Sequence, residues 1–239
     1  MTLFRFARVC VAFGALLIAG PAAGQTTGAL DQLIQLSLAA YGGEARLVQL
    51  ATLRVQGSIT VKGQAQPGRV ERLFQSPDRL LNMTTYAGGP SERRLLVKDR
   101  AWRNGQAASV PEHIAMSLQA ARLRLPLLLK ESRAHLIDQG QQEKGGRRFH
   151  AITLPVSEGI SLAVVIDSAT GLIVQTSGKL ALPDGTNADF TTLYGDYRVV
   201  EGIAVAMRED HYAQGAHTGT TSLERVDINR PLPGNAFTP

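Results

Sequence analysis

The sequence predicts a mainly β (α+β) protein, in which about eleven strands form a strongly curved, barrel-like antiparallel sheet with one N-terminal and one central helix. Three observations support this class. Apolar and polar residues alternate over many short segments, as in strands with one buried face. Turn-forming residues separate these segments, and no linker rich in Gly, Ser or Pro divides the chain. So many consecutive strands favour a curved sheet, and we expect a single domain over residues 25–239.

The first 24 residues have the three-part pattern of a secretory signal peptide. Arg5 and Arg8 precede an apolar run over residues 9–19, and small residues follow, which suits cleavage after Gly24. The apolar run is too short for a comfortable membrane span, so a cleaved signal is favoured over an uncleaved anchor. We therefore expect residues 1–24 to be removed on export.

Composition limits the chemistry that the exported chain can perform. Cys10 is the only cysteine and lies within the predicted signal peptide, so we expect no disulfide, thiolate metal site or cysteine nucleophile. The chain has 25 Lys and Arg residues against 20 Asp and Glu residues, and the basic residues are scattered. Nucleic-acid binding is not expected, because it requires a clustered basic patch.

The N-terminal part is predicted to change from helix to strands. Apolar residues in "GALDQLIQLSLAAYGG" (residues 28–43) recur at three- and four-residue spacing, Gly42 and Gly43 favour a helix end, and "EARLVQL" favours a short second turn. From Thr52 the period becomes two. The strands predicted in this part cover residues 53–61, 69–76, 79–86, 92–99 and 100–105.

The central helix begins with a capping signal. Ser109 and Glu112 have capping-box spacing, and Pro111 is tolerated in a first helical turn. Apolar residues then follow a helical stripe. Pro126 must end or kink this helix, because it lacks a donor and clashes with the preceding turn.

Strands resume after the central helix. They are predicted over residues 147–156, 160–167, 172–182, 189–200, 203–212 and 221–229. Glu201 and Gly202 suit a two-residue hairpin turn. Strict alternation would place Tyr194, Asp196 and Arg198 on the polar outer face, with Arg208 across from them in a cross-strand charge pair.

No motif in the sequence supports catalysis. There is no nucleophile elbow, no phosphate-binding glycine loop and no pair of histidines with metalloprotease spacing. His211 and His217 could meet beside Asp210 across a hairpin to bind a metal, although histidines on strand faces are more often structural or solvated. We expect a protein that is not an enzyme and has no cofactor or metal; an unrecognised hydrolase is the less favoured alternative.

The central helix and one face of the curved sheet are both strongly apolar. They could pack against each other as an ordinary core, or leave an apolar cavity for a small ligand or an acyl chain. The residues predicted to line such a cavity are Val55, Ile59, Leu73, Leu81 and Met83 from the sheet and Trp102, Ile114, Leu118 and Leu125 from the helix side.

The order of elements, with "AYGG", "LRVQGSITV", "VVIDSATGLIVQ", "YGDYRVVEGIAVAMRE" and "VDINRPLPGNAFTP", resembles the periplasmic lipoprotein-carrier (Lol-type, outer-membrane lipoprotein-sorting) superfamily. The resemblance covers nearly all of the chain after the signal. It implies an unclosed antiparallel barrel whose helices form a lid over an apolar cavity, with residues 112–125 as a lid element.

The function that this resemblance implies is periplasmic, non-enzymatic binding or carriage of a lipid or an acyl chain, such as that of a lipoprotein. The alternative is an accessory module with a filled core that docks another envelope protein. The expected partners are thus an acyl-bearing ligand and, in the alternative, an envelope protein or a lipoprotein.

Overall fold

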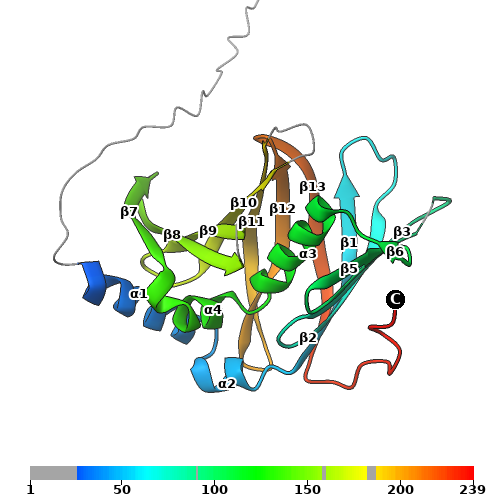
Figure 1. The fold of residues 1–239 in the computed structure, drawn as a ribbon. Coiled ribbons are helices and arrows are strands. Elements are labelled where there is room, and N and C mark those ends of the chain that lie inside the picture. The colour runs from blue at the N-terminus through cyan, green and yellow to red at the C-terminus, as the bar shows by residue number, and fades with distance from the viewer. Residues whose placement is uncertain (1–25, 90, 158–159, 182–186) are drawn as a thin grey trace, which may run out of the picture.

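A single curved antiparallel sheet with helices on one face forms the fold in the computed structural model, which describes residues 26–89, 91–157, 160–181 and 187–239 (Figure 1). The two edge strands are β6 Gln106–Ala107 and β7 Ile137–Lys144, and no pairing joins them in the part of the chain described, so the barrel is unclosed. The predicted fold class is confirmed. The predicted signal peptide lies outside the described residues.

The sheet contains thirteen strands among the described residues, against about eleven predicted. They are β1 Thr52–Val61, β2 Gly68–Gln75, β3 Arg79–Tyr86, β4 Glu92–Val97, β5 Arg100–Arg103, β6 Gln106–Ala107, β7 Ile137–Lys144, β8 Arg147–Ser157, β9 Ile160–Asp167, β10 Ile173–Ala181, β11 Asn187–Val200, β12 Ile203–Ala213 and β13 Ala216–Ile228. Their order across the sheet is β6-β5-β4-β3-β2-β1-β13-β12-β11-β10-β9-β8-β7. The helices are α1 Thr26–Ala40, α2 Glu44–Val48, α3 Val110–Arg122 and α4 Leu125–Glu131, followed by a 3₁₀ turn at Arg133–His135.

The two predicted helices form, but the central one is divided. The capping box at the start of α3 is confirmed: the backbone N–H of Ser109 donates to Glu112 Oε2 at 2.9 Å. Helix α3 then ends at Arg122, and Pro126 lies in the first turn of the separate helix α4. Proline suits a first turn because the missing donor is not needed there. The predicted lid element therefore spans two helices and the break between them.

Helix α3 bridges the two halves of the open sheet. It contacts β3, β4 and β5 on one side and β8 and β10 on the other (Figure 1). Helices α1 and α4 pack on each other beside it. The side chains enclosed between helices and sheet form the main core, which includes Leu30, Ile34, Leu38, Phe74, Leu80, Met116, Leu129, Ile152 and Val164.

A smaller apolar cluster lies on the opposite face of the sheet. Strand alternation turns Leu73, Leu81 and Leu95 away from the main core, where Ala236 of the C-terminal tail packs on them. Arg93 fixes this tail by donating to the backbone oxygens of Ala236 and Thr238, at 3.2 and 2.6 Å. The sheet between β2 and β5 is therefore apolar on both faces.

Candidate functional site

A cavity of about 100 Å³ lies between the sheet and the junction of α3 and α4. Helix α2 and this junction cover it, and strands β1 and β10 to β13 form its floor. Its lining is mostly apolar and includes Leu47, Val55, Leu125, Ile203, Leu223 and Ile228. Arg72, Arg122, Tyr194 and Glu209 also line it. The cavity therefore combines apolar walls with several charged and hydroxyl groups.

The end of α1 is held against the sheet beside this cavity. The hydroxyl groups of Tyr41 and Tyr197 are 2.8 Å apart, and the Tyr197 hydroxyl donates to the backbone oxygen of Ile173 at 2.5 Å. Burial raises the pKa of both tyrosines, so they stay neutral. Gly42 follows with a φ of 105°, and a Cβ there would lie 2.0 Å from the backbone oxygen of Gly202. Only glycine allows this approach of α1 to the β11–β12 hairpin.

The β11–β12 hairpin turns as predicted but is not regular along its length. Glu201 and Gly202 both have positive φ, which confirms the two-residue turn. Asp196 also has a positive φ of 49°, and the ladder to β12 skips it. Alternation is interrupted there, so that Tyr194 and Tyr197, three residues apart, both line the cavity. The prediction that Tyr194 faces outward is wrong for this reason.

The predicted cross-strand charge pair is also wrong, because each arginine pairs with an aspartate on its own strand. Arg198 pairs with Asp196 at 2.7 Å, and Arg208 pairs with Asp210 at 2.9 Å. Both pairs join residues two apart on the same strand, and neither pair crosses the hairpin. These exposed pairs add little to stability.

A buried ion pair joins β2 to β12 at the inner surface of the cavity. Arg72 Nη1 and Nη2 donate to the two carboxylate oxygens of Glu209 at 3.0 and 3.1 Å, and these side chains are only 11% and 12% exposed. Burial alone would raise the pKa of Glu209, but the charge and hydrogen bonds of Arg72 outweigh it and lower the pKa. Both groups are therefore charged at neutral pH.

The same arginine is linked to the bridging helix. Arg72 Nε donates to Asn82 Oδ1 at 3.1 Å, and Asn82 Nδ2 donates to Gln119 Oε1 of α3 at 2.6 Å. A continuous polar chain thus connects β12, β2, β3 and α3. Movement of α3 away from the sheet would have to break it.

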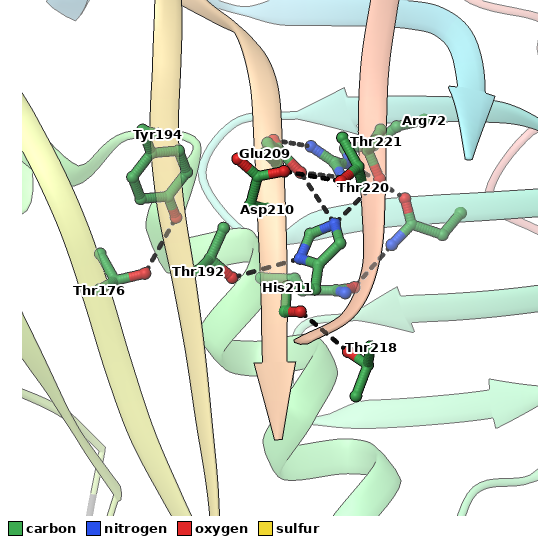
Figure 2. A network of polar contacts seen from close by, with 12 residues as sticks. Arg72, Thr176, Thr192, Tyr194, Glu209, Asp210, His211, Thr218, Thr220 and Thr221 are labelled. Atoms are coloured by element: carbon green, nitrogen blue, oxygen red, sulfur yellow. Dashed lines mark hydrogen bonds and ion pairs between the residues drawn. The ribbon is translucent and has the colours of Figure 1, made fainter. Parts of the chain in front are cut away.

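His211 of β12 lies beside this polar chain and contacts residues of β11 and β13 (Figure 2). Its Nε2 lies 2.9 Å from the hydroxyl of Thr221, and its Nδ1 lies 3.4 Å from that of Thr192. Burial lowers the pKa of His211, and so the neutral ring is favoured. Tyr194 shares a hydrogen bond of 2.9 Å with Thr176. No group of three or more His, Cys, Asp or Glu side chains in the described ranges is arranged to hold a metal ion.

The nine side chains predicted to line a cavity are divided between four places. Val55 and Leu125 line the cavity, and Ile114 and Leu118 pack in the main core. Ile59 lines a separate hollow of about 260 Å³ beside Arg72 and His211.

The other four predicted residues lie away from the cavity. Leu73, Leu81, Met83 and Trp102 belong to the cluster beneath the C-terminal tail. Because Phe74 and Leu80 point to the helices, their neighbours Leu73 and Leu81 point to the other face.

The charged groups of the site are the residues that the sequence prediction did not identify. A signal for Glu209 was present, since it continues the alternating apolar set Ile203, Val205 and Met207 of the same strand. A charge at an inward position of a strand indicates a buried partner. The sequence gives no such indication that the partner is Arg72, three strands away in the sheet.

Comparison with known proteins identifies the fold. No family model and no curated protein matches the sequence. A LolA superfamily protein from Nitrosomonas europaea matches in structure with a TM-score of 0.52 at 10% identity, over 91% of this chain and 99% of that chain. An outer membrane lipoprotein-sorting protein domain from Vibrio parahaemolyticus gives 0.47 at 11% identity, over 87% and 95%. No helix in the described part of the chain is long and apolar enough to cross a membrane. The chain therefore has the open-barrel fold of the LolA superfamily protein.

Proposed function

We propose that this chain is a non-enzymatic protein of the periplasm that binds or carries a lipid or an acyl-bearing ligand in the cavity under α3 and α4. In this proposal residues 1–24 direct export, and residues 25–239 act as a single carrier domain. The observation that supports it most directly is the apolar cavity between the open sheet and the junction of α4 with α3, the helix that bridges the two halves of that sheet. The fold shared with a LolA superfamily protein supports the same class of function.

The size of the cavity adds a condition to this proposal. At about 100 Å³, it is smaller than an engineered cavity of about 150 Å³ that accommodates benzene. A long acyl chain can enter only if the α3–α4 roof moves outward. Binding would then be driven by burial, which contributes about 0.8 kcal/mol for each CH₂ group removed from water.

An interaction module is the second candidate function. The densely packed core and the small cavity favour it, because a filled barrel could present its surface to another envelope protein. The two candidates differ in one property: only the carrier binds acyl chains reversibly.

Acyl binding can be tested directly on the purified protein. Organic extraction followed by mass spectrometry should release acyl lipids, and a fluorescent fatty acid should bind and be displaced by an unlabelled one. Val55→Phe, which adds volume to the cavity wall, should weaken this binding about tenfold or more. Val199→Phe makes the same change at an exposed position and should bind normally. If no acyl ligand is extracted and none binds, the carrier function is refuted and the interaction module is favoured.

A further inference from the structure

A second hollow, of about 210 Å³, lies beside the apolar cavity between α3, β4 and the strands β11 to β13. We call it the anion hollow. Arg94 of β4 and Arg122 of α3 line it, together with the hydroxyl-bearing side chains Thr191, Thr192 and Thr218. No Asp or Glu side chain is among the described residues that line it. Two guanidinium groups and several hydroxyl groups therefore face a space without a carboxylate.

Both arginines have hydrogen-bonding capacity left unused. The Nε atoms of Arg94 and Arg122 are buried and have no hydrogen-bond partner among the described residues. Arg94 reaches Glu92 through Nη2 at 2.8 Å, whereas no hydrogen bond or ion pair joins Arg122 to any other part of the chain that the structure describes. Buried donors are normally satisfied, and leaving them unpaired is unfavourable. An oxyanion in the hollow would supply an acceptor to the guanidinium groups that line it.

No carboxylate among the described residues forms a hydrogen bond with Arg122. The charge of Arg122 contributes to lowering the pKa of Glu209, but both oxygens of that carboxylate accept hydrogen bonds from Arg72. Burial raises the pKa of Tyr194 and lowers the pKa of His211, so both are neutral near pH 7. The last turn of α3 favours a cation through the helix dipole, but that effect supplies no acceptor for the guanidinium donors.

Arg122 also connects the anion hollow to the apolar cavity, because its side chain lines both. An amphiphile with its acyl chain in the cavity would place its polar end near this guanidinium. Guanidinium groups match the planar geometry of carboxylates and phosphates through paired hydrogen bonds.

We propose that Arg94 and Arg122 bind the oxyanion headgroup, a carboxylate or a phosphate monoester, of an anionic lipid whose acyl chain occupies the apolar cavity. This inference rests on the proposed carrier function and specifies its ligand class. A neutral lipid of the same length would offer no charged acceptor to the two guanidinium groups that line the hollow and would bind more weakly.

The headgroup is tested by comparing two ligands that differ only there. A long-chain fatty acid should bind roughly tenfold more tightly than the fatty alcohol of equal length, measured by displacement of a fluorescent probe with the full-length exported protein. Arg122→Gln should bring the fatty acid to the affinity of the alcohol and leave the alcohol unchanged. Arg122→Lys should retain part of the preference, because it keeps the charge. Arg124→Gln is the matched control, since Arg124 pairs with Glu131 and lines neither space.

The outcomes separate this inference from the carrier function itself. If neither acid nor alcohol binds, the carrier function fails and the inference fails with it. If both bind with equal affinity, the carrier function stands and the headgroup site is refuted. An equal effect of Arg122→Gln and Arg124→Gln on fatty-acid binding would also refute it.

Two further ligands distinguish a lipid headgroup from a free anion. A lysophosphatidic acid should bind at least as tightly as the fatty acid and lose affinity in Arg122→Gln. Inorganic phosphate should compete only at far higher concentration, because it lacks the acyl chain. If inorganic phosphate binds as tightly as the lysophosphatidic acid, the link between the hollow and the acyl cavity is overturned. Arg122→Gln should not lower stability in urea, since it removes an unpaired buried group.

Discussion

Arg72 and Glu209 pair across strands that are not neighbours in the sheet. β1 and β13 lie between β2 and β12. Adjacent strands are about 4.8 Å apart, which would put β2 and β12 roughly 14 Å apart in a flat sheet. The hydrogen bonds of 3.0 and 3.1 Å form because the sheet curves and both long side chains reach across its inner face. The pair therefore helps to select this curvature, although burying two charges yields little net stability.

Removing one partner of this pair should be strongly destabilising. Glu209→Gln would leave the Arg72 guanidinium buried without a counter-charge, and we expect the free energy of unfolding to fall by about 3 kcal/mol. Replacing both residues, as Arg72→Met with Glu209→Met, should recover most of this loss because no charge is left unpaired. Urea denaturation of the three proteins measures the effect.

The matched control for this prediction is an exposed pair of the same type. Arg69 and Glu224 are 3.0 Å apart, with side chains 78% and 54% exposed. Arg69→Gln should lower stability by less than about 1 kcal/mol. If Arg69→Gln and Glu209→Gln lower the free energy of unfolding equally, burial does not determine how much the Arg72–Glu209 pair contributes to stability.

At the scale of elements, the sequence predicts those strands and helices whose apolar residues have one clear periodicity. The predicted hairpin turn at Glu201 and Gly202 and the capping box of α3 depend on local chemistry, and both are confirmed. The edge strand β7 was not predicted, because "IDQGQQEK" is exposed along most of its length and has no buried face to impose alternation. A strand can be predicted from alternating apolar residues only where one of its faces is buried.

The candidate site shows a second limit of the sequence pattern. Both faces of β2 and β3 carry apolar residues, one for the main core and one for the C-terminal tail. Alternation can identify the two sets but cannot tell which faces the helices, so Leu73 and Leu81 were predicted on the cavity side. The positive φ of Asp196 similarly reverses the face of Tyr194.

The junction of α1 and α2 with the β11–β12 hairpin gives a prediction at this scale. Gly42 and Gly43 both have positive φ, at 105° and 92°, but only Gly42 faces an obstacle: a Cβ there would lie 2.0 Å from the Gly202 oxygen, whereas nothing is within 4 Å of a Cβ on Gly43. Gly43→Ala should lower the free energy of unfolding by about 1 kcal/mol through backbone strain alone. Gly42→Ala should lower it by about 3 kcal/mol, because the helix must also move off the hairpin.

Thermal and urea denaturation of the two glycine variants provide the comparison. Far-UV circular dichroism should show that both keep the native content of strands. If the two substitutions are equally destabilising, the close approach of Gly42 to Gly202 adds nothing to stability beyond the positive φ of the glycine. The explanation of Gly42 by this contact then fails.

At the scale of the whole molecule, helices cover the inner face of the open sheet within the described ranges. Helix α3 bridges the two halves of the sheet, and its polar link to the sheet runs from Gln119 through Asn82 to Arg72. The break between α3 and α4 at Arg124, which has non-helical backbone angles, lies directly at the cavity. Since the cavity is too small for a long acyl chain, the proposed carrier function would require these helices to separate from the sheet during loading.

This requirement predicts that fixing α3 to the sheet prevents loading. In a Cys10→Ser background, Asn82→Cys and Gln119→Cys place two thiols where the side chains are now in contact, and a short bifunctional thiol-reactive reagent with a cleavable spacer can join them. The joined protein should take up a fluorescent fatty acid at least tenfold more slowly than the same protein before reaction, and cleavage of the reagent should restore uptake. Ser58→Cys with Ser222→Cys is the control, because these residues face each other within the β1–β13 ladder and the link does not involve a helix. Uptake at an unchanged rate after joining α3 to β3 would show that ligand reaches the cavity without movement of the bridging helix, and the cavity would then have to expand from the sheet side instead.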